Sequence, residues 1–201
     1  QFTNPRTIDI NPDDKNLNIK YLSGEKIFNP AKNQFYKSSL RVMRECVGNI
    51  ETYLSNNNSV IVRGRRFSGK TVVLSILAER YQKYTVLFFP SEFMVDEDLL
   101  HSILENSTET LFLFDSNSLS DYAYQLVAHS EKLLKKKNNK LVVATNTNDI
   151  YLPDTLNAET VLLPPSFEGD EIKQLIPACD KYGLSRRKTK ETNIDYLKRL
   201  S

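Results

Sequence analysis

The chain has 201 residues, of which 40% are hydrophobic, and its 27 basic and 25 acidic residues give a formal net charge of +2 at pH 7. This length suits one α/β domain with some additional material, and the near balance of charge does not indicate a nucleic-acid binder. Its two cysteines, Cys46 and Cys179, are too few and too far apart for a disulfide framework or a zinc site, which favours the reducing cytoplasm. No apolar run approaches the ~18 residues of a membrane helix and no signal peptide is visible, so we expect no membrane partner.

Residues 1–37 predict a loop-like N-terminal linker or strap. The stretch is polar, contains three prolines and shows no sustained hydrophobic period. Between Ser38 and Leu54, apolar residues recur at helical spacing, and the polar run Ser55 to Asn58 ends that pattern. We therefore expect a helix over 38–54 that leads directly into the next strand.

The most informative stretch runs from Ser59 to Leu74 and predicts a short apolar strand, a turn and the start of a helix. Within it, Gly64 to Thr71 match the pattern G-x-x-x-x-G-K-[ST] without a mismatch. This pattern is the P-loop, or Walker A, signature of proteins that bind nucleoside polyphosphates. The alternative is a glycine turn that caps an ordinary helix.

The residue types in this loop are those that phosphate binding requires. Gly64 allows the tight turn out of the strand, and Gly69 allows the backbone to approach the phosphates closely. Backbone N–H groups at the start of a helix favour an anion. Lys70 supplies a charge for the β- and γ-phosphates, and the Thr71 hydroxyl suits Mg²⁺. The predicted nucleotide-binding residues are Gly64, Phe67, Ser68, Gly69, Lys70, Thr71 and Val72.

The rest of the chain predicts alternating helices and strands. The expected elements are a strand at 85–89, a helix at about 96–106, a strand at 111–115, a helix at about 120–137, and strands at 141–144 and 160–163. Several of these strands are apolar throughout, as in strands that are buried on both faces. The pattern therefore indicates an α/β fold with a mostly parallel sheet between helices.

Two further polar residues are placed at strand ends. Asp115 ends the apolar run of 111–114 as in a Walker B motif, whose aspartate holds the Mg²⁺ that bridges the phosphates. Asn146 follows the strand at 141–144 and could sense the γ-phosphate or orient the attacking water, although it could also be a turn former. We therefore expect Thr71 and Asp115 as metal ligands, and Lys70, Asp115 and Asn146 as catalytic residues.

These motifs, in this order on alternating strands and helices, resemble the AAA+/STAND branch of P-loop NTPases. The resemblance covers about residues 38–177 and implies a three-layer αβα core whose five-stranded parallel sheet has the order 5-1-4-3-2. It implies a core at 38–166 that binds ATP or ADP with Mg²⁺, in which Asn146 is sensor 1. For the strap, the alternative to a linker is that residues shortly before the core fold over the nucleotide base. The turn at 163–167 resembles the junction to a helical lid, so 167–201 is expected to be the start of that lid or a C-terminal extension. A turn at 180–187 and a helix at 189–200 are expected there.

One position departs from the family pattern. The residue after the Walker B aspartate is usually an acid that serves as the base for water, but here it is Ser116. Loss of a general base costs ~10²–10⁴ in rate, so we expect slow hydrolysis unless another carboxylate substitutes. Glu92 and Asp121 are the candidates, with a solvated turn and a helix start as the simpler roles.

Several basic residues stay unassigned. The family's arginine finger and second sensor have no clear counterpart, since Arg65 and Arg66 lie within the P-loop itself. Basic runs at 135–137 and 186–190 could form a patch, although solvated helix ends are the simpler interpretation. His101 and His129 are expected to be ordinary surface residues.

By this resemblance, the leading hypothesis is a STAND-type signalling switch, with defence or antiviral signalling as a possible setting. Its nucleotide state would control homo-oligomeric assembly through the NTPase core, and effector and sensor domains would belong to the same chain. Because the sequence begins with Gln1 rather than Met, we expect a fragment of such a protein.

Two other functions are compatible with a P-loop motif. A DNA-handling AAA+ ATPase, such as an initiator, loader or transposition helper, would show salt-sensitive DNA binding, and the near-neutral charge does not favour it. A P-loop kinase would need an arginine-rich lid between the core strands, which is absent from the sequence. The absence of an N-K-x-D motif favours adenine over guanine as the base.

Overall fold

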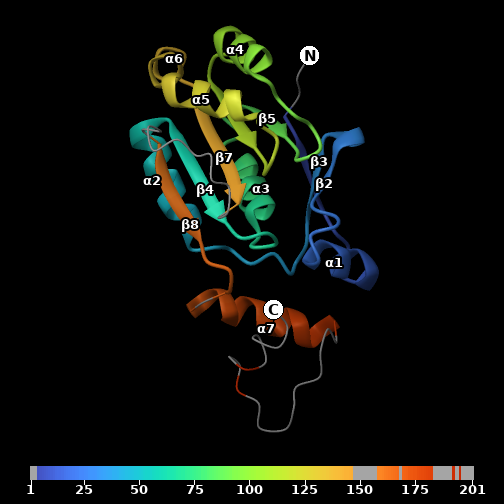
Figure 1. Cartoon of the computed structure of the whole chain (residues 1–201). Helices are drawn as coiled ribbons and strands as arrows, with labels where there is room; N and C mark the ends of the chain where they lie inside the picture. The colour runs from blue at the N-terminus through green and yellow to red at the C-terminus, as the bar shows by residue number, and fades with distance from the viewer. Residues whose placement is uncertain (1–3, 147–157, 168, 183–191, 193–194, 196–201) are drawn as a thin grey trace.

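The computed structural model describes residues 4–146, 158–167, 169–182, 192 and 195, and it contains one large and one small β-sheet (Figure 1). The large sheet has five strands in the order β5-β6-β7-β4-β8. All of its pairings are parallel. These strands are β4 (Ser59–Gly64), β5 (Thr85–Phe89), β6 (Thr110–Phe114), β7 (Lys140–Asn146) and β8 (Glu159–Leu163). Numbered as strands of the core, this is the predicted order 5-1-4-3-2, so the fold class is confirmed.

Helices cover both faces of the large sheet and complete a three-layer αβα arrangement. On one face, α2 (Cys46–Asn57) and α3 (Lys70–Arg80) pack on one set of strand side chains. On the other face lie α4 (Glu97–Asn106), α5 (Asp121–His129) and α6 (Glu131–Lys136). Each face of the sheet has its own hydrophobic core, and strand β6 contributes to both. Leu111 and Leu113 pack in the core beneath α2 and α3, whereas Phe112 and Phe114 pack in the core on the opposite face. Alternate side chains of a strand point to opposite faces, so an entirely apolar strand fits this central position.

Side-chain caps explain where two of these helices begin. The Asp96 carboxylate accepts a hydrogen bond from the N–H of Leu99 at 2.9 Å, and the Ser120 hydroxyl accepts one from Ala123 at 3.2 Å. Each bond satisfies an amide that has no partner within its own helix. The predicted starts near 96 and 120 are therefore close to the observed ones.

Two helix predictions were wrong in extent. The helix predicted over 38–54 begins only at Cys46, because a turn around Ser38 and contacts of Arg44 hold the preceding segment in a non-helical path. The single helix predicted over 120–137 is two helices that meet at Ser130. The Ser130 hydroxyl donates to the carbonyl of Val127, an example of a local side-chain bond that competes with regular structure.

The prediction that the N-terminal linker or strap is loop-like was also wrong. Residues 4–37 contain a small sheet of order β1-β3-β2, together with a helix, a unit that we call the N-terminal unit. Its elements are β1 (Arg6–Asp9), α1 (Lys15–Leu22), β2 (Phe28–Asn29), the 3₁₀ helix η1 (Pro30–Lys32) and β3 (Gln34–Lys37). Strands of two to four residues are too short to produce a detectable hydrophobic period.

Aromatic packing attaches this unit to the core. The rings of Phe28, Phe35 and Phe88 form a triangle with centroid separations of 4.8, 4.6 and 4.7 Å, and Phe88 belongs to the edge strand β5. Asn4 adds two bonds to the same edge of the sheet: its side chain accepts from the N–H of Val86 and donates to the carbonyl of Tyr84. Tertiary contacts therefore determine the structure of the N-terminal unit.

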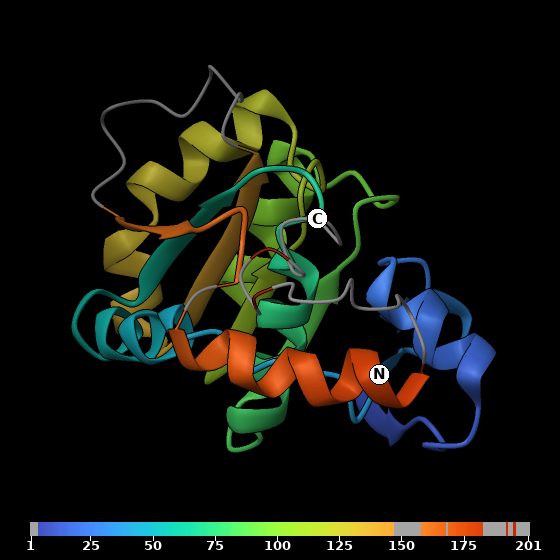
Figure 2. The same ribbon diagram turned by 90° about the horizontal axis from the view of Figure 1, so that it is seen from below.

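Beyond the sheet, α7 (Gly169–Tyr182) lies on the side where the parallel strands end (Figures 1 and 2). It includes the first residues of the turn predicted at 180–187, and the helix predicted at 189–200 falls almost entirely outside the described residues. No described helix has the length and apolar character that crossing a membrane requires.

Replacing Phe35 by alanine should destabilise the protein by about 3–5 kcal/mol, because it removes a fully buried ring from the aromatic triangle. Urea unfolding measures this change. The control is Ile8→Ala on the neighbouring strand β1, where the side chain is largely exposed and the cost should stay within about 0.5 kcal/mol. Equal losses for both variants would show that the N-terminal unit is not packed on the core as described.

Candidate functional site

The P-loop connects the end of β4 to the first residue of α3, as the sequence predicts. A Cβ on Gly64 would lie 2.5 Å from the Ser68 hydroxyl and 3.0 Å from the Leu163 Cβ, so this position has no room for a side chain. Gly69 has a φ of +90°, a conformation that favours glycine. Gly64 is therefore required for steric reasons, and Gly69 is favoured by its backbone conformation.

Lys70 lies in the first turn of α3, and its ammonium folds back over the loop. Its Nζ donates to the carbonyls of Gly64 at 3.0 Å and Arg65 at 2.7 Å, and to the Oδ1 of Asn146 at 3.1 Å. Asn146 ends β7 and is the register partner of Gly64 on β4. The parallel pairing of these two strands thus places the amide side chain of Asn146 beside the P-loop lysine.

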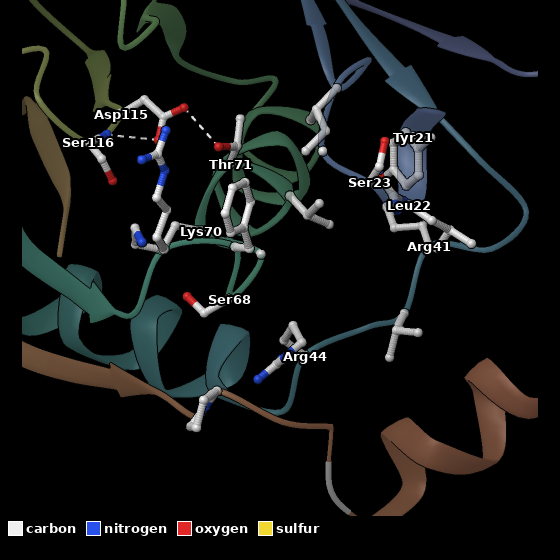
Figure 3. Close-up of a pocket in the computed structure, with 18 of the residues that line it drawn as sticks. Tyr21, Leu22, Ser23, Arg41, Arg44, Ser68, Lys70, Thr71, Asp115 and Ser116 are labelled. Atoms are coloured by element: carbon white, nitrogen blue, oxygen red, sulfur yellow. Dashed lines mark hydrogen bonds between the residues drawn. The ribbon is translucent and has the colours of Figure 1, made fainter. Parts of the chain in front are cut away.

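Thr71 and Asp115 form the second polar contact of the site (Figure 3). The Thr71 hydroxyl donates to Oδ2 of Asp115 at 2.8 Å, and the N–H of Ser116 donates to Oδ1 at 2.8 Å. Asp115 directly follows β6 and is only 7% exposed. Burial raises the pKa of Asp115 above its ordinary value, while the Thr71 and Ser116 bonds and the charge of Lys70 partly offset that effect.

This pair suits a magnesium ion. A hydroxyl and a carboxylate are hard oxygen ligands, and Mg²⁺ usually takes one or two protein ligands, with water and phosphate oxygens completing its shell. The described residues contain no cluster of three or more acidic, histidine or cysteine side chains that could hold a metal by themselves. Thr71 and Asp115 would thus hold the ion together with a bound polyphosphate.

A cavity of about 660 Å³ opens beside the P-loop. This volume lies within the range of small-ligand pockets, roughly 300–1,000 Å³. Three parts of the chain line it: the loop and strand ends just described, the N-terminal unit with the following segment, and α7 with its approach. The lining residues outside the predicted site are Tyr21, Leu22, Ser23, Gly24, Ile27, Leu40, Arg41, Val42, Arg44, Arg66, Ser91, Ser116, Asn117, Pro165, Phe167 and Leu175.

Arg44 joins two of these parts. Its guanidinium forms an ion pair with Glu171 of α7 at 3.2 Å, donates to the carbonyl of Pro164 at 2.9 Å, and lies 4.7 Å from the centre of the Phe167 ring. Glu171 also accepts from the N–H of Glu45 at 2.9 Å. Arg44 and Glu171 are both buried, so these contacts fix α7 against the segment that precedes α2.

Sequence reasoning missed the wall formed by Tyr21, Arg41 and Arg44. The sequence carried no signal for Arg41 and Arg44, because the apolar residues around them keep an unbroken helical spacing. A helical assignment places such arginines on a solvent face, whereas the observed path turns both toward the cavity.

The remaining candidates separate into near and distant residues. Ser116 lines the cavity, and Glu92, although exposed, lies close enough for its charge to raise the pKa of Asp115. Asp121 is an exposed first-turn residue of α5 and does not line the cavity. Arg66 lines it, with its guanidinium 5.3 Å from the ring centre of the exposed Phe67, while Arg65 is exposed.

The other charged residues lie outside the cavity. His101 faces Glu105 at 3.4 Å, and Lys135 pairs with Glu131 at 2.7 Å, both on exposed helix surfaces. His129 is exposed in the last turn of α5. The basic run at 186–190 lies outside the described residues.

No family model matches the sequence, and no curated protein matches it. Among solved structures, the chain is similar to the RuvB Holliday junction branch migration motor of Thermotoga maritima, with a TM-score of 0.49 and 17% identity. That match covers 71% of this chain and 55% of the other chain. One variant of RuvB gives the same values, and another gives a TM-score of 0.45 and 16% identity over 70% and 51% of the two chains. The chain therefore spans about half the length of these structures.

Glu79, near the end of α3, holds the N-terminal side of the cavity in place. It pairs with Lys37 at 2.7 Å and with Arg41 at 2.7 Å. Burial alone raises the pKa of Glu79, but the hydrogen bonds and positive charges of Lys37 and Arg41 outweigh it, so the pKa is lowered from its ordinary value. Folding therefore stabilises the ionised carboxylate.

Replacing Glu79 by glutamine should cost roughly 1–2 kcal/mol of stability near pH 7. Since the folded-state pKa is lowered, this contribution is present above the unfolded-state pKa, about 4.3, and is lost as the pH falls through the folded-state value. Urea unfolding across a pH series should show a constant gap between wild type and variant above about pH 6 and a shrinking gap below about pH 4. A gap that persists undiminished to about pH 3 would contradict this assignment. Glu25→Gln, at an exposed carboxylate, is the control.

Proposed function

We propose that this chain is a nucleotide-binding module of the P-loop type that takes ATP or ADP with Mg²⁺. The observation that supports this most strongly is the convergence of Lys70, Thr71, Asp115 and Asn146 from three adjacent strand ends onto one cavity. Each of these residue types has a separate task in polyphosphate binding. An ordinary capped helix would need no buried lysine, and no carboxylate bonded to its first-turn threonine.

The proposed roles follow from the positions of the side chains. The amides at the start of α3 bind phosphate oxygens, because the first turn of a helix has N–H groups without intrahelical acceptors. Lys70 exchanges backbone carbonyl acceptors for phosphate oxygens, which are stronger partners for an ammonium. Asn146 keeps contact with Lys70 and offers its amide N–H to the terminal phosphate or to a water. When bound, magnesium supplies positive charge to the phosphates, and Thr71 and Asp115 hold it.

Hydrolysis by this site is proposed to be slow. Ser116 occupies the position after Asp115, and a hydroxyl is not a base at neutral pH. Asp115 itself accepts bonds from Thr71 and Ser116 and is assigned to the metal. Glu92 carries an additional negative charge that acts on Asp115, but it is exposed. A slow site favours two lasting nucleotide states over rapid turnover.

Such a site suits a STAND-type signalling switch in which the bound nucleotide controls homo-oligomeric assembly, with effector and sensor domains elsewhere in the protein. The contacts of Arg44 support this, because they join α7 to the cavity wall and give a bound ligand a path to the C-terminal side. A ligand shifts such an equilibrium only through different contacts in the two states. Salt-sensitive binding to duplex DNA would instead favour the DNA-handling alternative.

Replacing Lys70 by alanine should weaken binding of ADP with Mg²⁺ by about 10–100-fold, the value of one charge-assisted hydrogen bond. Isothermal titration calorimetry measures this on the same preparations whose folding is checked by circular dichroism. Lys83→Ala, at an exposed position just after α3, should bind like wild type. Absence of magnesium-dependent uptake by folded wild type, or unchanged uptake by the Lys70 variant, would refute the proposed function.

Replacing Ser116 by glutamate should increase ATP turnover by about 10²–10⁴, because it adds a carboxylate base beside Asp115. Phosphate release under saturating ATP and Mg²⁺ measures the rate. Ser116→Gln is the matched control, because glutamine has nearly the size of glutamate but cannot act as a base. Rapid turnover by the wild type, or equal rates for the two variants, would show that the missing base does not limit hydrolysis.

A further inference from the structure

Two buried polar groups at the N-terminal side of the cavity lack hydrogen-bond partners within the described part of the chain. These groups are the hydroxyl of Tyr21, whose side chain belongs to a residue only 3% exposed, and Nη1 of Arg41, whose side chain is 9% exposed. Tyr21 is in the last turn of α1, and Arg41 lies in the segment that precedes α2. Both residues line the same cavity as the P-loop (Figure 3).

Such groups are uncommon, because most buried donors and acceptors are paired and each unpaired one reduces stability. A buried polar atom without a partner is therefore a sign that the residue serves a function and not the stability of the fold. Both residues line the same end of one cavity, and the charge of Arg41 is near enough to act on the Tyr21 hydroxyl. One ligand at this end of the cavity could therefore bond to both groups.

The other contacts of Arg41 hold its guanidinium in place and leave Nη1 able to donate to a ligand. Its other terminal nitrogen, Nη2, donates to Glu79 at 2.7 Å, and its backbone N–H donates to the carbonyl of Ser38 at 3.0 Å. The Ser38 hydroxyl donates in turn to Asn18 of α1, a fully buried side chain. This chain of bonds fixes Arg41 and α1 relative to each other before any ligand arrives.

The surroundings of this pair suit a flat aromatic ligand with polar edges. Leu22, Ile27, Leu40 and Val42 add apolar surface to the same cavity. Burial raises the pKa of Tyr21 to about 12, so the hydroxyl is neutral at physiological pH and both donates and accepts. Apolar walls with a few convergent polar groups are typical of sites that bind small organic ligands.

We propose that Tyr21 and Arg41 recognise the purine base of the nucleotide whose phosphates the P-loop holds. Nη1 of Arg41 donates to a ring nitrogen such as N7, and the Tyr21 hydroxyl bonds to the exocyclic substituent on C6, which lies on the same edge of the purine. This inference rests on the proposed function and extends it, because it makes the N-terminal unit part of the nucleotide site. The base then contributes to docking of that unit on the core.

The test compares MgATP, MgCTP and magnesium tripolyphosphate, which has no base, by calorimetry on wild type and on Tyr21→Phe. The substitution removes only the hydroxyl, and we expect it to weaken MgATP about 5–10-fold while leaving tripolyphosphate affinity unchanged. We expect thermal stability to stay the same or to rise, because an unpaired buried hydroxyl is lost. Wild type should bind MgCTP more weakly than MgATP.

Two other variants complete the design. Tyr81→Phe, at a half-buried tyrosine that does not line the cavity, should bind all three ligands like wild type. Arg41→Lys keeps a positive charge for Glu79 but has no Nη1, and it should show the same ATP-selective loss as Tyr21→Phe.

Four results would overturn the inference: unchanged MgATP affinity in both site variants, an equal loss for tripolyphosphate, a lower melting temperature of Tyr21→Phe, or equal wild-type affinity for MgATP and MgCTP. A wild type that binds neither MgATP nor tripolyphosphate would overturn the proposed function itself. That outcome is distinct, because it concerns the phosphates and not the base.

Discussion

Parallel pairing of the central strands is the constraint on which the site depends. Because β4, β6 and β7 run in the same direction, the residues that follow them meet at one edge of the sheet. This geometry places the Thr71 hydroxyl 2.8 Å from the Asp115 carboxylate although 44 positions separate them. It also places Asn146 within hydrogen-bond distance of Lys70. A different strand order would leave the same motifs in the sequence but would separate their side chains.

The core could be predicted because several of its strands are apolar throughout and its loop has a strict pattern. Leu111 to Phe114 are buried on both faces, and such a run is readable without knowledge of its neighbours. Gly64 and Gly69 are required by steric and conformational limits that any strand–loop–helix unit of this kind shares. These are local constraints, and local constraints leave a signal in the sequence.

The other walls of the cavity could not be predicted, because they depend on contacts between distant residues. Phe28 and Phe35 form short strands only by packing on Phe88 of the core. Arg44 lies outside the helix that the sequence predicts, because its guanidinium bonds to the Pro164 carbonyl and pairs with Glu171, both more than a hundred residues later in the chain. Propensity is a weak prior that tertiary contacts override. The walls that the N-terminal unit and α7 add to the cavity were thus the part hidden from sequence reasoning.

The most direct test of the account is a crystal structure of the protein with ADP and Mn²⁺, in which anomalous scattering locates the metal ion. We predict a single strong peak about 2.1 Å from the Thr71 hydroxyl and in contact with a phosphate oxygen, with Asp115 beside it directly or through one water. The phosphates should lie against the amides that begin α3, with Lys70 turned toward them. A nucleotide bound elsewhere, or a metal ion with no contact to Thr71 or Asp115, would contradict the account.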